Sequence, residues 1–480
     1  MDYESWTKEA LISRLRQLEP APTEQPPSDT SMEPPKRKKQ RRAADFDFSK
    51  FPQRKIALKF SYFGWPYHGL ARQGNALGSA EKQRVEEQYP TVEGELFKAL
   101  AKCKLIENED TCGYSRCGRT DRGVSGLGQV AALYVRSNGK FIGEEEEEGV
   151  EGAVTQAQQN GGRRVLLPNA DAELPYVSML NRNLPAEIRV LAWSPVSDSF
   201  DARFSCRSRF YRYFFSEAGL DISLMRDAAA RFQGTHDFRN FCRLDPAKQI
   251  KNFERTVLSI AITEVPLGMR FAGNGAAAEA RWWQLELRGT AFLWHQVRCM
   301  MAVLFLVGQG LETPDIVDRM MDVGTMDGKP EYEMASDIPL VLADCAFDAG
   351  DLRWNHVHGA GEEYGNMRVL DETVGREWGM LQTRTLVAGA LLETLRTTHV
   401  PVKGAGQPAS AAWDECREKA VASKTAGGVR TVLGGGQVRH VSRYVKMAER
   451  KRAMPVDVRN RAWAERKGIK TADGPADGSE

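Results

Sequence analysis

The sequence has no C-x-x-C cysteine pair, no long uninterrupted apolar run and almost no net charge. Its eight cysteines are scattered over 480 residues. Because structural zinc sites usually draw on closely spaced ligand pairs, this spacing predicts neither structural zinc nor a disulfide framework, and it favours reduced thiols inside a cell. The N-terminal residues lack the apolar core of a signal peptide. The most apolar run, residues 291–310, is interrupted by His295, Gln296 and Arg298, which predicts a buried helix and no membrane span.

The net charge of +2 hides an uneven distribution of charged residues. The segment Lys36–Arg42 is basic apart from Gln40, and Lys424–Lys470 holds 13 Lys and Arg against 3 Asp and Glu. Basic stretches on a nearly neutral chain indicate a polyanionic partner, although solvated tails have the same composition. For Lys36–Arg42 three interpretations remain: a nuclear-import signal, an RNA-contacting arm or a solubilising tail.

The order of apolar patterns predicts an α+β fold. Strands are expected at 55–64, 129–135, 188–193, 209–216, 256–265 and 281–288, and helices at 91–102, 176–183, 224–232, 291–310 and 378–395. Two runs with similar element content predict two pseudo-symmetric α/β halves with a central antiparallel sheet around a cleft. The glycine-rich segment 427–436 is expected to be a flexible turn region.

This pattern divides the chain into four parts. The first part combines an amphipathic helix at Trp6–Leu18, a Pro-rich linker and the basic arm, mostly disordered. An acidic, low-complexity stretch inside the first half, residues 137–172, is expected to be a disordered insertion. The expected parts are residues 1–53, a first catalytic half at 54–175, a second half at 176–350, and a C-terminal extension at 351–480 with a basic RNA-contacting segment.

The stretch Tyr114–Val130, YSRCGRTDRGVSGLGQV, carries one carboxylate, Asp121, among three arginines. Nearby guanidinium groups favour the ionised form of a carboxyl, and an ionised, positioned carboxylate can act as a nucleophile or a general base. The surrounding glycines allow a tight turn and the close approach of a ligand. Taken alone, the same residues would also suit a surface turn with an Arg–Asp pair.

The GRTD motif followed by Gly-Val-Ser-Gly and Gly-Gln-Val resembles the catalytic loop of the TruA-type tRNA pseudouridine synthases. In that family the Asp of GRTD is the essential nucleophile, a role that falls on Asp121. Family members usually have Ala where this chain has Gly126. Exchange of one small residue for another is not expected to disturb the chemistry.

Further blocks resemble the same family in the same order and span roughly residues 54 to 348. They are NRNLPAEIRV (181–190), FDARFSC (200–206), RFYRY (209–213), GTAFLWHQVR (289–298) and IPLVL (338–342), where Pro339 stands in place of the usual Gly. Three segments, YSRCGRTDRGVS, GTHDFRNFCRLD and SDIPLVLADCAF, resemble eukaryotic members that act on uridines 38 and 39 of the tRNA anticodon arm.

The resemblance implies roles for residues of this chain. Asp121 would start the reaction, by attack on the sugar or on the base, and Arg298 would pair with it and hold it ionised. Arg119 would help to extrude the target base, and Tyr211 would stack on the uracil and help to remove the C5 proton. Substrate contacts are expected from Arg116, Arg122, Tyr211, Leu340, Leu342 and His68, and the family uses no metal or other cofactor.

Each of these residues also has a structural interpretation. Tyrosines in aromatic strands, such as Tyr211, most often pack in a core, and Arg298 could pair or cap within a buried helix. His68, in the WPYHG turn, suits an RNA contact or a structural role better than a catalytic one.

The resemblance also implies partners: a tRNA bound through its anticodon arm in a basic cleft, a second copy of the chain in a homodimer, and no membrane. The expected location is the nucleus and the cytoplasm. Three alternatives remain: a sister synthase with another tRNA target, a non-catalytic protein that binds or folds tRNA, and an Asp-nucleophile hydrolase. The last would need metal-binding carboxylates near Asp121, where the sequence places arginines.

Overall fold

The computed structural model describes residues 46–72, 79–142, 153–156, 164–265, 281–355, 359–398 and 428–468. Asp47–Glu480 forms one compact unit, separate from Met1–Phe46, and the account below concerns that unit. The predicted helix Trp6–Leu18, the Pro-rich linker, the basic arm Lys36–Arg42 and the acidic run Glu144–Glu148 lie outside the described residues.

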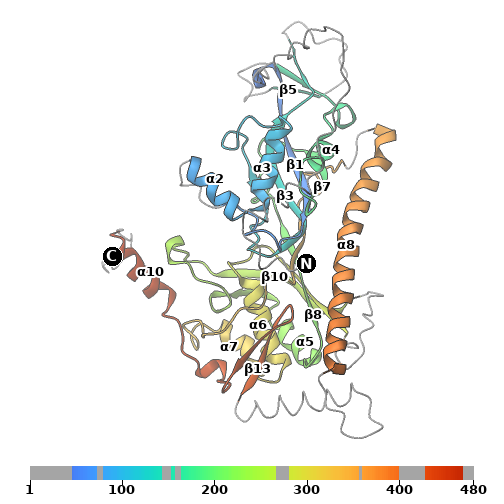
Figure 1. The fold of residues 1–480 in the computed structure, drawn as a ribbon. Helices are drawn as coiled ribbons and strands as arrows, with labels where there is room; N and C mark the ends of the chain where they lie inside the picture. The colour runs from blue at the N-terminus through green and yellow to red at the C-terminus, as the bar shows by residue number, and fades with distance from the viewer. Residues whose placement is uncertain are drawn as a thin grey trace, which may run out of the picture. The chain divides into compact units, whose positions relative to one another are not determined.

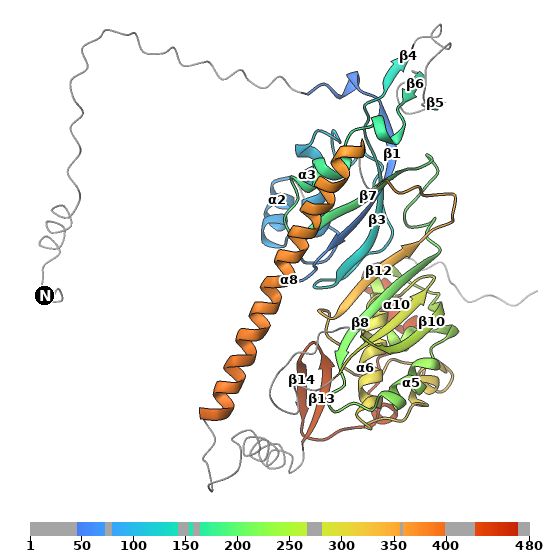
Figure 2. The same ribbon diagram turned by 90° about the vertical axis from the view of Figure 1, so that its right-hand side faces the viewer.

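One twisted sheet runs through both predicted halves, in the order β7-β1-β3-β12-β8-β11-β10-β9 (Figure 2). Its strands are β1 (Gln53–Tyr62), β3 (Ser125–Arg136), β7 (Ile188–Pro195), β8 (Ser208–Ser216), β9 (Gly234–Asp237), β10 (Glu254–Glu264), β11 (Trp282–Gly289) and β12 (Leu340–Ala346), with the short β2 (Ser115–Arg116) paired to β3. These neighbours pair antiparallel, except β3 and β12, which run parallel with Ser125 opposite Val341. The predicted α+β class with a central, mostly antiparallel sheet is confirmed. α4 (Tyr176–Asn181) and β7 pack with β1 in the first half, so the two halves divide after β7 and not at residue 175, and the parallel β3–β12 pair joins them.

Each of the five predicted helices has a counterpart in the structure, whereas α2 and α7 were not predicted (Figure 1). α3 begins after Thr91, whose side chain accepts a hydrogen bond from the amide of Gly94, as an N-cap residue does. α6 begins five residues later than the apolar run predicted. The helices are α2 (Ser79–Gln88), α3 (Val92–Lys102), α4 (Tyr176–Asn181), α5 (Ile222–Ala230), α6 (Gln296–Gly308), α7 (Ile316–Met321), α8 (Gly359–Thr398) and α10 (Val456–Arg466).

Three apolar clusters fill the unit. Alternate residues of β1 point to opposite faces of the sheet: Leu58 joins the cluster beneath α3 and α4, whereas Ala57 joins a smaller cluster on the other face. The second half has its own large cluster, built around α6, which is buried along almost its whole length. The smaller cluster, which includes Cys117, Leu342 and Cys345, lies beside the β3–β12 junction.

Two expectations about irregular segments need correction. The described part of the insertion is not without structure, because β4 (Lys140–Ile142), β5 (Ala153–Gln156) and β6 (Arg164–Leu167) form a small antiparallel sheet. The expected flexible turn at 427–436 is largely a hairpin of β13 (Val429–Gly434) and β14 (Gln437–Val441). The sequence shows only that glycine is frequent in this segment, which suits a loop and a tight turn equally. In the structure Gly434, Gly435 and Gly436 have the positive φ values that the hairpin turn needs.

The C-terminal segment is part of the second half. Ser336 donates its amide to the carbonyl of Leu433, and both Met447 and Val456 are buried in the cluster around α6. The boundary predicted at residue 351 therefore does not separate residues 429–466 from the second half. No helix among the described residues is long and apolar enough to cross a membrane.

Candidate active site

The loop between β2 and β3 holds Asp121 in place through its neighbours. The hydroxyl groups of Thr120 and Tyr62 share a hydrogen bond of 2.8 Å in the interior. The amide of Val124 donates to the carbonyl of Asp121 over 3.2 Å, which closes a tight turn. Gly123 in this turn has a φ of +79°, and a Cβ there would lie 2.9 Å from the carboxyl carbon of Asp337. The turn therefore requires glycine, as the sequence predicted for this stretch.

A buried glutamine fixes the start of the same loop. The side-chain amide of Gln129 donates to the carbonyl of Gly118 over 2.9 Å, and its oxygen accepts from the amide of Gly118 over 3.1 Å. Gln129 is fully buried, so both bonds lie in a site with little competing water. This reciprocal pair holds the backbone three residues before Asp121.

Two side chains from the segment before α6 reach the carboxylate. The indole Nε1 of Trp294 donates to Oδ1 of Asp121 over 3.1 Å. The Nε2 of His295 lies 3.5 Å from Oδ2, and His295 has a φ of +62°, an unusual conformation for a residue with a side chain. Burial, together with Arg298 and other cations, lowers the pKa of His295 to about 4. His295 is therefore neutral at pH 7, and its contact with Asp121 is not an ion pair.

Burial raises the pKa of Asp121 above its ordinary value, and this effect outweighs the nearby charge of Arg298, the hydrogen bond from Trp294 and the charge of Arg119, which all lower it. The sequence predicted the opposite, namely that the nearby guanidinium groups would favour the ionised form of Asp121. Sequence proximity to arginine does not report desolvation, which depends on the whole fold.

Arg298 does not hold Asp121 in the direct pair that was expected. Its Nε donates to the carbonyl of Ala335 over 2.8 Å, and its Nη1 lies 3.9 Å from Oδ2 of Asp337. Arg298 still acts on Asp121 through its charge, as the largest of the effects that lower the pKa of that carboxyl.

Asp121 lines a cleft of about 1060 Å³ to which both halves contribute. The cleft is strongly basic, because nine cationic side chains line it against the three carboxylates of Asp121, Asp245 and Asp337. A basic cleft of this kind concentrates a polyanion beside the carboxylate. The cationic residues are Arg116, Arg119, Arg122, Arg203, Arg209, Arg243, Lys248, Arg255 and Arg298.

Tyr211 lines the cleft from the middle of β8, with its ring edge-on to Phe292 at a centroid distance of 5.0 Å. Burial raises the pKa of Tyr211 far above its ordinary value, so the phenol keeps its proton at pH 7. Leu340 also lines the cleft, as predicted. Leu342 does not: it is fully buried in the cluster at the β3–β12 junction, and its side chain packs under Gly118.

The remaining predicted site residues all line the cleft, with different surroundings. Arg119 and Arg122 are exposed to solvent. Arg116 forms an ion pair with the buried Glu93 of α3, which ties this arginine to the first half. His68 packs edge-on against Tyr89 at 4.9 Å, and burial together with the charge of Arg122 lowers the pKa of its imidazole.

Sequence reasoning missed several residues of the site. Trp294 and His295 lie inside the GTAFLWHQVR block, so their distance of four and three residues from Arg298 was an available signal. Asp337 directly precedes the IPLVL block. Arg203, Arg209, Arg243, Lys248 and Arg255 come from separate segments, and only the fold shows that they meet at one cleft.

Among the described residues, the carboxylates of the cleft join no group of three side chains that could hold a metal ion. The hydrolase alternative required such a group beside Asp121, so the geometry does not support it. One such group does occur in the described part of the chain, and it consists of Cys117, Cys206 and Cys345.

Comparison with known proteins gives consistent similarities. A family model described as tRNA pseudouridine synthase matches residues 228–348. Proteins named tRNA pseudouridine(38/39) synthase are 44% identical in Bos taurus, 41% in Homo sapiens and 37% in Saccharomyces cerevisiae. The alignments cover 64%, 74% and 98% of this chain, and 58%, 67% and 93% of those relatives. The chain thus aligns with less than two thirds of the bovine relative and with nearly all of the yeast one.

Proposed function

The chain belongs to the TruA-type tRNA pseudouridine synthases, and we propose that it converts uridine to pseudouridine at positions 38 and 39 of tRNA, without a cofactor. The name shared by the bovine, human and yeast relatives supports these target positions. The observation that carries the proposal is the carboxylate of Asp121, which is partly buried and held by Trp294 within a basic cleft.

The reaction breaks the N-glycosidic bond, turns the base and joins C5 to C1′. Asp121 starts it as nucleophile or general base, with Trp294 and His295 fixing the direction of its carboxylate. The target base must first leave its stack, at a cost of a few kcal/mol. Arg119, exposed at the cleft, is placed to take the position of the extruded base, and Tyr211 offers a ring for stacking. Because Tyr211 remains protonated at pH 7, a role in removing the C5 proton would require another group to accept the phenol proton.

We propose that the tRNA is bound mainly through its phosphates, along a surface that continues from the cleft onto α10. The side-chain amide of Gln249 donates to the carbonyl of Asn460, and Asn460 donates to the carbonyl of Ile250, so α10 is fixed beside the cleft wall that carries Lys248. Truncation at Val441 would remove the buried Met447 and Val456, so it is not a clean test.

A charge-neutralising variant avoids that problem. Replacement of the exposed Arg461, Arg466 and Lys467 by Gln is expected to weaken tRNA binding and to reduce the slope of log K against log salt. A control with Lys98 and Lys102 of α3 replaced by Gln is expected to change the slope less. Equal slopes for wild type and the α10 variant would contradict the role of α10.

We propose that the chain acts as a homodimer that pairs through α8. This helix exposes large apolar side chains, and Met380, Val387 and Leu391 lie seven and four residues apart, hence on one side of it. Light scattering is expected to give twice the chain mass for wild type and the chain mass for Val387→Glu/Leu391→Glu. The substitution Gln382→Glu is the matched control, and a monomeric wild type would contradict the proposal.

We propose that the protein occupies the nucleus as well as the cytoplasm, with Lys36–Arg42 as the import signal. The density of basic residues in this segment supports the proposal. A fluorescent fusion is expected to lose its nuclear signal when these basic residues are replaced by Gln, and an unchanged distribution would contradict it.

The decisive test of substrate is site mapping. Purified protein is incubated with a transcribed tRNA that carries U38 and U39, and pseudouridine is located by mass spectrometry. Product at these two positions supports the proposal, and a tRNA with cytidine at both positions is the control. Product at other positions would favour a sister synthase, and binding without product would favour a non-catalytic tRNA-binding protein.

A further inference from the structure

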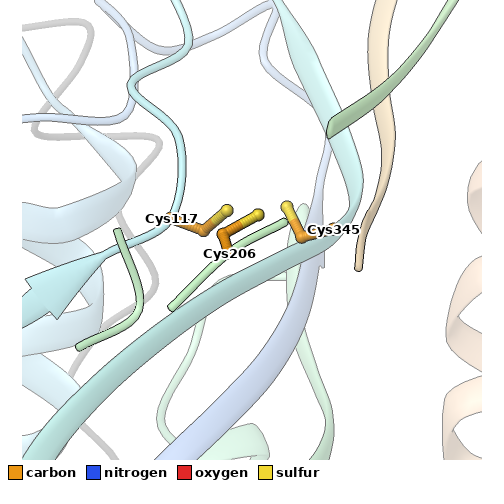
Figure 3. Close-up of side chains that lie close together, drawn as sticks. All are labelled: Cys117, Cys206 and Cys345. Atoms are coloured by element: carbon orange, nitrogen blue, oxygen red, sulfur yellow. The ribbon is translucent and has the colours of Figure 1, made fainter. Parts of the chain in front are cut away.

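Three cysteines that are far apart in the sequence meet beside the catalytic loop. The sulfur atoms of Cys117, Cys206 and Cys345 all lie within 4.8 Å of one another, and the three side chains lie side by side (Figure 3). Each residue is buried, with 4 to 8% of its surface exposed. The spacing of cysteines along the chain predicted no metal site, because it cannot show residues that converge from distant segments of the chain.

The three cysteines come from segments that build the active site. Cys117 lies four residues before Asp121 and lines the cleft. Cys206 lies two residues before β8, the strand of Tyr211, and Cys345 lies in β12, the strand of Leu340. A ligand that bridged the three sulfurs would therefore tie the catalytic loop to two strands that line the cleft.

The geometry suits a thiophilic cation. Zinc binds thiolate at about 2.3 Å, which places two sulfurs of a tetrahedral site about 3.8 Å apart. The observed sulfurs need to close by no more than about 1 Å to reach this arrangement. Because Cys117 lines the cleft, an ion has a path to the site from solvent.

The surroundings also prepare the site for a cation. Three thiolates and one divalent ion carry a charge of −1, which the guanidinium of Arg209 can balance, since it donates to the carbonyl of Cys117 over 3.1 Å and to that of Cys206 over 3.5 Å.

We propose that Cys117, Cys206 and Cys345 form a binding site for a thiophilic divalent cation of the zinc type, which fixes the base of the catalytic loop. Binding displaces the thiol protons to solvent and involves no change of oxidation state. The fourth position of the ion is left to water or to an external thiol. The proposal does not rest on the identity of the tRNA substrate.

The test uses the full-length, reduced and chelator-treated protein, titrated with Co(II) and then with Zn(II). Wild type is expected to develop a sulfur-to-cobalt charge-transfer band that saturates at one equivalent and disappears when Zn(II) is added. Loss of an outer partner of a metal site already costs 10- to 100-fold in affinity, so Cys345→Ser is expected to weaken binding by about 100-fold or more. Cys112→Ser, at a buried cysteine outside the trio, is the matched control and is expected to bind as wild type does.

A second measurement needs no variant and covers the case in which Cys345→Ser does not fold. Zn(II) is expected to protect Cys117, Cys206 and Cys345 of wild type from alkylation, as located by mass spectrometry, and to leave the partly exposed Cys103 reactive. Absence of the charge-transfer band in wild type, a band that Cys345→Ser retains, or equal alkylation with and without Zn(II) would each overturn the proposal.

Discussion

The indole Nε1 of Trp294 donates a 3.1 Å hydrogen bond to Oδ1 of Asp121 and so joins the segment before α6 to the catalytic loop of the first half. The two residues are 173 positions apart in the chain. The bond opposes the effect of burial on the carboxyl, because it favours the ionised form. Trp294 therefore both orients the carboxylate and favours its ionised form.

Replacement of Trp294 by Phe tests this role. The variant loses a hydrogen bond to a charged acceptor, which is expected to lower kcat/KM by about 10- to 100-fold. Because the bond lowers the pKa of Asp121, the acid limb of the pH–rate profile is expected to move to higher pH. Trp282→Phe, at an exposed tryptophan at the start of β11, is the control. An unmoved acid limb in Trp294→Phe would contradict the role of the bond.

Because the pKa of Asp121 is raised in the folded protein, its ionised carboxylate is expected to lower the stability of the fold. A carboxyl whose pKa is higher in the folded state favours folding most when it is protonated, and this contribution is lost as the pH rises through the raised pKa. At pH 7, Asp121→Asn is therefore expected to melt at the same temperature as wild type or higher, and the difference is expected to shrink as the pH falls towards 4. Thermal melts of both proteins at pH 4 to 8 measure this difference. An Asp121→Asn variant that melts at a lower temperature than wild type at pH 7 would contradict the prediction.

Gln129 is expected to position the loop that carries Asp121 through its two hydrogen bonds to Gly118. Gln129→Leu leaves the amide and the carbonyl of Gly118 without their side-chain partners, and each unsatisfied buried group costs about 1–3 kcal/mol. Urea unfolding is expected to show a loss of a few kcal/mol, and kcat is expected to fall because the loop that carries Asp121 loses its anchor. Gln284→Leu, at a buried glutamine of β11, is the control. Equal effects of both variants on kcat would argue against a positioning role for Gln129.

Gly126 is a position where the usual family residue does not fit without adjustment. A Cβ there would lie 2.7 Å from ring atoms of Tyr62, whose hydroxyl group bonds to Thr120 next to Asp121. Gly126→Ala is expected to destabilise the fold by about 1–3 kcal/mol and to lower kcat, since Tyr62 must move. Gly375→Ala in α8, where a Cβ meets no neighbour, is expected to be neutral or stabilising by up to about 1 kcal/mol. If Gly126→Ala changed neither the stability of the fold nor kcat, Tyr62 would be shown to move without an energetic cost.

The sequence predicted those parts of the fold that depend on local pattern. The helix at 91–102 and the strand at 188–193 were visible because their apolar residues recur with the period of one buried face. The loop that carries Asp121 was identified because its GRTD motif resembles that of a known family, whereas its Gly and Arg residues alone would also suit a surface turn. The β13–β14 hairpin was missed because its glycines look the same in a tight turn and in a loop.

Features that depend on distant contacts were not visible. Leu340 and Leu342 are two residues apart in β12, so the period of a strand places both on the same face. Only the packing of the Leu342 side chain against Gly118 shows that this residue does not line the cleft. Arg298 was expected to pair with Asp121, but its partner is Asp337, a carboxylate that no sequence spacing linked to it. The three-cysteine cluster escaped notice for the same reason.

The central claim is that Asp121 starts the isomerisation, and one comparison tests it most directly. Asp121→Asn keeps the shape of the side chain and removes its charge, and Asp348→Asn changes a carboxylate that is paired with Arg207 on the surface. In single-turnover assays on a tRNA with U38 and U39, Asp121→Asn is expected to lose at least about 10³-fold in rate while it still binds tRNA, and Asp348→Asn is expected to match wild type. An Asp121→Asn variant that forms pseudouridine at the wild-type rate would contradict the account.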